Sequence, residues 1–201
     1  MRPLDWPRPH PSSNRKDSHL ADQLSDDELS AALAGEPSGF SAVYTVVSPA
    51  VLGYFRARGV EDAEALTQDV FVAILPKLAT VTGGHKGLRT FIFSVAHARL
   101  VDCRRRAERT PYLAEYDPRD DTRFAASAED EALGSLGGIS NTLARLNEEQ
   151  REVLVLRIVA DLSIEQVAGI MDKTPGAIKQ LQRRGLSALR ELVSEKDHAA
   201  S

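Results

Sequence analysis

The fold of this 201-residue chain is decided by the stretch Ser163-Ile-Glu-Gln-Val-Ala-Gly-Ile-Met-Asp-Lys-Thr-Pro-Gly-Ala-Ile-Lys-Gln-Leu-Gln-Arg-Arg184. Ser163, with Gln166 three positions later, predicts a capping box at the start of a short helix. A turn follows, and Thr174 before Pro175 predicts the N-cap and first position of a longer helix. Two helices around a tight turn, the second one longer, are typical of a helix-turn-helix motif.

The longer helix separates an apolar side from a basic and amide-bearing side. Ile178, Leu181 and Gly185 recur at helical spacing and predict the packed side. Arg and Lys neutralise phosphates, and Gln or Arg can pair with base edges, so the other side indicates DNA binding. A solvated basic face on an ordinary helical bundle is the alternative interpretation. The candidate DNA-binding residues are Thr174, Lys179, Gln180, Gln182, Arg183 and Arg184.

Composition favours a soluble, all-α, cytoplasmic protein. Lys and Arg number 25 against 29 Asp and Glu, and hydrophobic residues make up 42% of the chain, enough for real cores. Few β-branched alternations and no hairpin signals are present. The single cysteine, Cys103, excludes an internal disulfide framework and is predicted to be a buried structural thiol rather than a redox sensor. No apolar run approaches the roughly 18 residues of a membrane helix, so no membrane insertion is expected.

The first half of the chain predicts further helices. Ser25 and Glu28 have the spacing of a capping box. Apolar residues recur at three- and four-residue steps between 40 and 55, although Pro49 is expected to kink that helix or break its hydrogen-bond ladder. A loop from Thr80 to Gly87 precedes a third long helix that reaches Cys103. Between them a helix within 61–78 is predicted from the apolar stripe Leu66, Val70, Ile74 and Leu78.

Charge divides the chain into segments. Residues 83–109 hold seven basic and two acidic side chains, whereas 110–131 hold two basic and seven acidic ones with little periodicity. The acidic stretch predicts a flexible linker. The fold class is therefore all-α, with two small helical domains joined by a flexible acidic linker. The predicted segments are a disordered tail at 1–24, a first domain at 25–109, the linker at 110–138, the helix-turn-helix domain at 139–194 and a flexible tail at 195–201.

Both domains together resemble the extracytoplasmic-function (group IV) sigma factors of RNA polymerase, of actinobacterial type. The first domain is similar to their second conserved region, and the helix-turn-helix domain to their fourth, in the family's order. The stretches that carry the resemblance are Phe40-Ser-Ala-Val-Tyr44, Asp62-Ala-Glu-Ala-Leu-Thr-Gln-Asp-Val-Phe-Val-Ala-Ile-Leu75, Arg89-Thr-Phe-Ile-Phe-Ser-Val-Ala-His-Ala-Arg-Leu-Val-Asp-Cys-Arg-Arg-Arg106, and Leu143-Ala-Arg-Leu-Asn-Glu-Glu-Gln-Arg-Glu-Val-Leu154 through Leu192.

The resemblance implies a promoter-specific initiation factor that binds core RNA polymerase at the largest-subunit clamp helices and the β-subunit flap. The helix within 62–78 would dock on the clamp helices through Glu64, Gln68 and Asp69. The helix-turn-helix would read the −35 duplex. The segment from Ala79 and the following helix would hold the −10 strand, where a splayed base suits a glycine-containing loop. The residues implied for −10 DNA are His85, Lys86, Arg89, Arg99, Arg104, Arg105 and Arg106.

Three departures from the family pattern limit which properties of the family can be expected of this chain. Phe91 stands where the family usually has Trp, and Pro76 is expected to distort the last turn of the polymerase-binding helix. The stretch Ile178-Lys-Gln-Leu-Gln-Arg-Arg-Gly-Leu186 differs from the common recognition helix. Base preference therefore does not follow from the resemblance.

Two other classes of protein are alternatives to this interpretation. An operator-binding regulator would share the helix-turn-helix but would act without polymerase. An enzyme is not expected, because the five histidines are dispersed and no phosphate loop is present, so neither a cofactor nor a metal is predicted. Family members are commonly held by anti-sigma proteins, and the sequence identifies no such partner.

Overall fold

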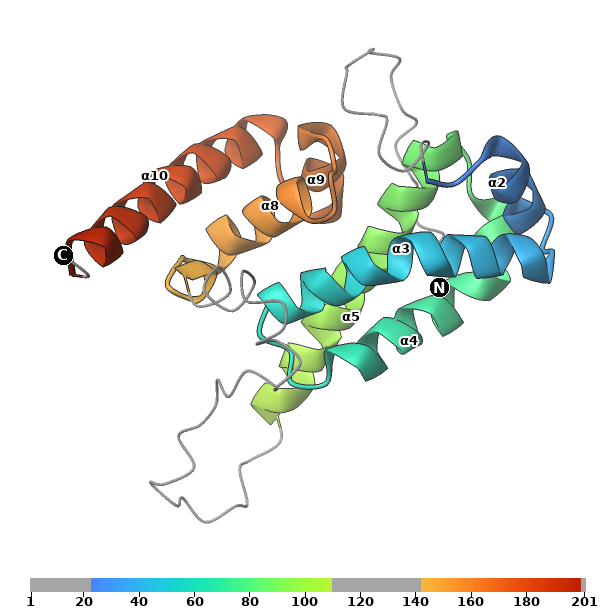
Figure 1. Ribbon diagram of the computed structural model, residues 1–201, viewed down its shortest axis with the longest axis horizontal. Helices are drawn as coiled ribbons and strands as arrows, with labels where there is room; N and C mark the ends of the chain where they lie inside the picture. The colour runs from blue at the N-terminus through green and yellow to red at the C-terminus, as the bar shows by residue number, and fades with distance from the viewer. Residues whose placement is uncertain (1–22, 110–141, 200–201) are drawn as a thin grey trace.

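The computed structural model describes residues 23–109 and 142–199, and these form two helical domains (Figure 1). The first domain contains α2 (Asp26–Leu33), α3 (Pro37–Ala57), α4 (Ala63–Ile74), the 3₁₀ helix η1 (Leu75–Thr80) and α5 (Gly84–Arg109). The second contains α8 (Glu148–Ile158), α9 (Ile164–Ile170) and α10 (Pro175–Ala199). The all-α prediction is confirmed. The predicted linker at 110–138 and the tail up to residue 22 lie outside the described residues.

The first domain is built around the apolar face of α3. Val43, Val47 and Val51 lie four residues apart and are fully buried, as is Phe55 one turn further. These residues pack against apolar side chains of α4 and α5. The helix continues through Pro49 and ends at Ala57, so proline does not terminate it. Burial of this continuous face offsets the one backbone hydrogen bond that proline removes.

One helix in the described part of the chain, α3, has the length and apolar composition of a membrane span. Its 21 residues include a face of large side chains that the other helices of the domain cover. A core helix of a water-soluble domain has this same pattern. The sequence prediction had found no such segment, because Pro49 and several small residues interrupt its apolar run.

The predicted distortion at Pro76 is confirmed. The α-helical bonding of α4 ends at Ile74, and the chain continues as the 3₁₀ helix η1. Gly83 and Gly84 both have positive φ, 88° and 60°, and make the turn into α5. Because α5 begins at Gly84, the loop is shorter than the predicted one, which extended to Gly87.

Side-chain caps set the helix boundaries of the second domain as the sequence predicts. Asn147 accepts a hydrogen bond from Glu149 N, and Ser163 and Gln166 form the complete capping box of α9. Thr174 Oγ1 accepts from Ala177 N at 3.2 Å at the start of α10. Gly185 allows α10 to approach α8, because a Cβ there would lie 2.9 Å from Leu154 Cδ1. The described part of α10 continues to Ala199.

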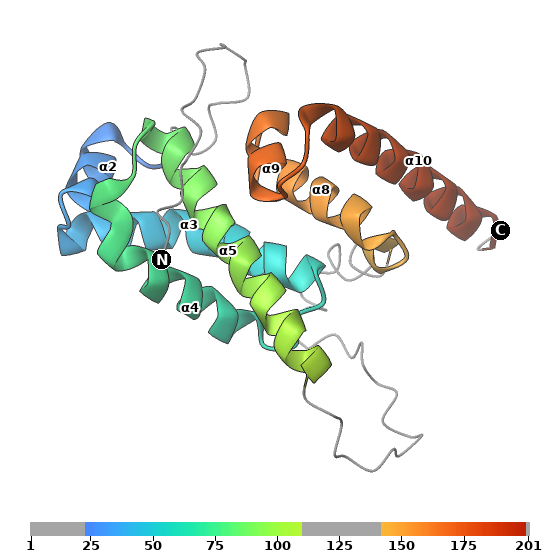
Figure 2. The ribbon, with the colours of Figure 1, turned by 180° about the vertical axis from the view of Figure 1, so that it is seen from behind.

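The second domain packs against the first through α8 and α9. Contacts join α9 to α5 and α8 to α3. In both views, α8 and α9 lie between α10 and the helices of the first domain (Figures 1 and 2). Helix α10 is therefore on the outer side of the molecule.

Candidate polymerase and nucleic-acid surfaces

The residues predicted to bind polymerase form an exposed stripe on α4. Glu64, Gln68 and Asp69 are all exposed. Glu64 Oε1 accepts a hydrogen bond from Arg56 Nη2 at 2.6 Å, and this bond lowers the pKa of Glu64. The side chains of that pair are 39% and 56% exposed, so the ion pair is a surface contact worth less than about 1 kcal/mol.

Apolar side chains continue this stripe, and the sequence analysis missed them. Val72 and Leu75 are 73% and 51% exposed, and Tyr44 of α3, at 39%, packs edge-on against Phe71. Val72 lies four residues after Gln68, on the same helical face. An exposed apolar row next to carboxylates is typical of a protein-binding surface. The spacing 64, 68, 72 and 75 was the signal in the sequence, hidden by the stronger stripe of Val70 and Ile74.

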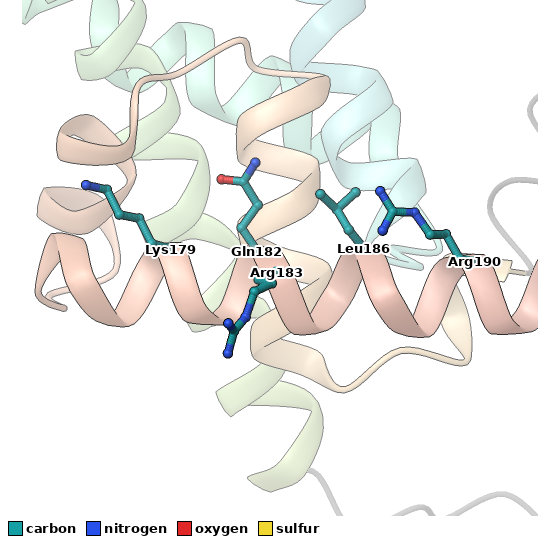
Figure 3. A pocket seen from close by; sticks show the side chains of 5 residues that line it. All are labelled: Lys179, Gln182, Arg183, Leu186 and Arg190. Atoms are coloured by element: carbon teal, nitrogen blue, oxygen red, sulfur yellow. The ribbon is translucent and has the colours of Figure 1, made fainter.

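The residues predicted to bind −35 DNA lie along α10. All of them are exposed except Gln182, which is half-buried. Thr174 uses its hydroxyl oxygen to cap the helix. An open hollow of about 280 Å³ runs along this surface. It is lined by Lys179, Gln182, Arg183, Leu186 and Arg190, with Arg183 turned away from the other four in the view of Figure 3.

This surface has the chemistry of a major-groove reader. A helix fits the major groove, and exposed guanidinium and amide groups can pair there with phosphates or base edges. Arg190 belongs to the same surface, although it was not in the predicted set. The structure therefore brings the predicted −35 residues together on one accessible helix.

The first residues predicted to bind −10 DNA lie in the first turn of α5. Lys86 is exposed, whereas His85 is half-buried. His85 Nε2 lies 2.8 Å from the carbonyl oxygen of Leu24, to which it donates a hydrogen bond. His85 Nδ1 lies 3.7 Å from Asp26 Oδ1. The imidazole therefore holds the start of α2 against α5, a structural role that the sequence did not predict.

Arg89 is directed at the second domain. Its guanidinium donates hydrogen bonds to the carbonyl oxygens of Ala160 and, at 3.5 Å, Val159, at the end of α8. The guanidinium carbon also lies 5.7 Å from the centre of the Phe93 ring. Burial lowers the pKa of Arg89, and Asp161 partly offsets this effect. Arg89 thus satisfies carbonyls that the C-terminus of a helix leaves unpaired.

The basic cluster at the end of α5 is divided between two environments. Arg104 is half-buried, and it forms an ion pair with Glu148 of α8 and donates to the Arg58 carbonyl oxygen at 3.4 Å. Arg105 and Arg106 are exposed. The predicted −10 residues therefore fall into three groups. Two contact the second domain (Arg89 and Arg104), three are exposed (Lys86, Arg105 and Arg106), and two are half-buried (His85 and Arg99).

A buried carboxylate, Glu152 of α8, lies at the centre of the interface between the domains. It is 3% exposed. Its Oε1 accepts hydrogen bonds from Tyr54 Oη at 2.6 Å and from His97 Nδ1 at 2.9 Å. Its Oε2 lies 2.8 Å from Arg58 Nε, whose N–H is not aimed at that oxygen, so the contact is an ion pair rather than a hydrogen bond. All three partners belong to the first domain.

The ionisation of this cluster follows from its contacts. Burial raises the pKa of Glu152, but the His97 hydrogen bond and the Arg58 charge outweigh burial and leave that pKa below its usual range. Burial and the Glu152 charge together raise the pKa of Tyr54. Tyr54 therefore stays a phenol and a donor, and Glu152 stays ionised at neutral pH. The sequence analysis assigned no role to these residues.

Comparisons with known proteins match the second domain to a family model and most of the chain to several relatives. A family model described as sigma-70, region 4, matches residues 142–191. The chain is 31% identical over 186 residues to the ECF RNA polymerase sigma factor SigD of Mycobacterium tuberculosis H37Rv, covering 87% of this chain and 86% of that protein. It is 28% identical to ShbA of Streptomyces griseus, covering 82% of this chain and 92% of that protein.

Two further comparisons concern length and fold. BldN of Streptomyces coelicolor is 29% identical over 82% of this chain, which spans only 64% of BldN. A solved structure of CnrH in complex with the cytosolic domain of CnrY has a TM-score of 0.61 and 21% identity, and it covers 84% of this chain and 96% of that chain. The latter likeness shows a shared fold.

Proposed function

Since the chain belongs to the extracytoplasmic-function family of RNA polymerase sigma factors, we propose that it binds core RNA polymerase and directs promoter-specific initiation through the surfaces described above. The stripe of α4 would contact polymerase, the basic face of α5 would hold the −10 strand, and α10 would read the −35 duplex. The observation that carries this assignment is the exposed basic face of α10 within the region matched to sigma-70 region 4.

The comparisons give the operator-binding alternative no support. The matched relatives are named as RNA polymerase sigma factors, and their similarity extends through both domains of this chain. Sigma factors of this family act as initiation factors on RNA polymerase. An anti-sigma partner and contact with the polymerase β-subunit flap remain predictions for this chain.

Run-off transcription tests the proposal directly. Core polymerase would transcribe a genomic fragment library with and without this protein, and the 5′ ends of the transcripts would be sequenced. We expect new starts that depend on the protein and share spaced −35 and −10 elements. Tight binding to operator-length duplex without core, and no new starts, would instead support the operator-binding alternative.

The α4 surface can be tested by charge reversal. Asp69→Lys places a cation in the exposed stripe, so we expect core binding to weaken by about tenfold, the equivalent of about 1.4 kcal/mol. Glu36→Lys is a matched control, because Glu36 is exposed, makes no side-chain cap and changes the net charge equally. Equal loss of core binding in both variants would show that net charge, rather than this surface, controls the affinity.

A further inference from the structure

We propose that the packed arrangement of the two domains is an autoinhibited closed state of the free chain. In this state the second domain covers the part of the −10-binding face of α5 that holds Arg89 and Arg104, while the recognition helix α10 stays accessible. The inference rests on the proposed function, because it concerns residues assigned there to the −10 strand.

The first argument is competition for the same side chains. Arg89 donates its guanidinium N–H groups to carbonyls at the end of α8, and Arg104 pairs with Glu148 on the same helix. A phosphate that approached this face would compete with the second domain for these guanidinium groups. Binding of DNA by Arg89 and Arg104 and packing of the second domain on them therefore oppose each other.

The start of α5 is covered as well. Gln166 Nε2 of α9 donates to Thr90 Oγ1 and lies 3.3 Å from the Lys86 carbonyl oxygen. Thr90 is buried, and its own hydroxyl donates to that same Lys86 carbonyl at 2.8 Å. The helix turn assigned to a flipped −10 base is thus closed off by a side chain of the second domain.

The second argument is geometric. In both views α8 and α9 lie between α5 and α10, so the two basic helices are held apart by the thickness of one helix, about 10–12 Å. The −35 and −10 elements lie about 25 base pairs apart, or roughly 85 Å along B-form DNA. A chain that holds both elements must therefore separate its domains, and the closed state can engage only one of them.

The third argument is that the interface suits reversible opening. Its named contacts centre on Glu152, which meets Tyr54, Arg58 and His97 of the first domain. A buried ion pair specifies one geometry but adds little net stability, because separated charges recover their hydration. We infer that these contacts define the closed position and that binding to polymerase and DNA can replace them.

An engineered disulfide can trap the closed state. A Cβ added at Gly53 would lie 3.5 Å from Val159 Cγ1, so Gly53→Cys with Val159→Cys brings two thiols close enough to bond across the interface. The full-length chain would carry Cys103→Ser to remove its native thiol. Each single cysteine variant is the matched control. Failure of the pair to cross-link under mild oxidation would overturn the proposal, because the thiols meet only in the closed state.

Function is then compared in the oxidised and reduced forms of one preparation. We expect the cross-linked chain to lose core-dependent transcription and binding to a −10 single strand by at least about tenfold, to keep its affinity for −35 duplex, and to recover with reductant. Full transcription by the cross-linked chain would overturn autoinhibition. Absence of transcription from the reduced and unmodified chains alike would refute the proposed function instead.

A second variant opens the interface without a cross-link. Glu152→Gln removes the charge that pairs with Arg58, so the closed fraction should fall and the −10 single strand should bind about threefold to tenfold more tightly. Glu36→Gln is the control, since Glu36 is exposed, makes no side-chain cap, and loses the same charge away from the interface. Unchanged −10 affinity in Glu152→Gln, together with unchanged cross-linking, would count against closure through Glu152.

Discussion

The basic faces of α5 and α10 have the same chemistry but differ in access. Both carry arginines at helical spacing that are suited to phosphates. On α10, Arg183 and Arg184 are exposed on the outer side of the molecule, whereas on α5 Arg89 and Arg104 face the other domain. Both guanidiniums on α5 have a pKa that burial lowers.

This difference shows that tertiary packing, rather than residue type, decides which basic face can meet DNA. An arginine that already donates to a helix C-terminus or a carboxylate must exchange those partners before it can bind phosphate. An exposed arginine exchanges only water. The closed chain is therefore expected to meet DNA through α10 first.

The largest expected effect concerns the exposed face. Arg183→Ala with Arg184→Ala should weaken −35 duplex binding by about a hundredfold or more, because each of the two arginines contributes about 1–3 kcal/mol at a base edge. The effect should be the same in the cross-linked and reduced forms of the Gly53/Val159 cysteine pair. Fluorescence anisotropy at fixed salt measures both affinities.

The adjacent arginine pair on α5 is the control for this variant. Arg105→Ala with Arg106→Ala removes two exposed charges of the same kind and should leave −35 affinity unchanged. Equal losses from both double variants would mean that general charge attracts the duplex, and the contrast between the two faces would fail.

A smaller effect is expected at the covered face. Tyr54→Phe removes the phenol that donates to Glu152, a hydrogen bond to a charged group worth about 1.5–3 kcal/mol. In the Gly53→Cys/Val159→Cys variant, the equilibrium between the disulfide and the two free thiols is measured against glutathione. It gives the effective concentration of one thiol at the other, which reports how often the domains are closed. We expect that concentration to fall by about tenfold to a hundredfold.

Tyr44→Phe is the matched control on the same helix, since Tyr44 is 39% exposed and packs by its ring against Phe71. It should leave the effective concentration unchanged. If Tyr54→Phe left it unchanged too, the phenol would not contribute to domain closure.

The helices could be predicted from the sequence because their signals are local. Ser25, Ser163 and Thr174 cap the helices that they were predicted to begin, and Pro76 ends the α-helical bonding of α4. Pro49 is the exception. A local rule predicted a kink or a broken hydrogen-bond ladder there, yet the helix continues past the proline because it buries a long apolar face.

The interface could not be predicted in the same way. Tyr54 and Glu152 are 98 residues apart, and neither has a local pattern that marks it as a partner of the other. Glu152 looks like one more surface carboxylate in an acidic helix start, and Arg89 like one more cation in a basic segment. Only the packing of two domains turns these residues into a buried pair and a helix cap.

The smallest expected effect is a dependence of closure on acid, and its sign follows from Glu152. In the closed state this carboxyl has a lowered pKa, whereas in an open chain it is hydrated and near its ordinary value of about 4.3. Burial opposes the hydrogen bonds and the Arg58 charge that lower this pKa. The stabilisation of the closed state by the ionised carboxylate is complete above the ordinary pKa. It is lost as the pH falls through the lowered pKa of the closed state.

The same thiol equilibrium, measured from pH 7 downwards with a pH-independent reference pair of cysteines, reports this loss. Five titratable or charged groups surround the carboxylate: Tyr54, Arg58, His97, Arg104 and Glu148. Their contributions to the pH dependence of closure must be separated from that of Glu152. Glu152→Gln makes that separation, because it retains the surrounding groups and removes only the titrating carboxyl. An acid dependence that is equally steep in Glu152→Gln would assign the effect to these neighbours and leave Glu152 with a purely positional role in closing the two domains.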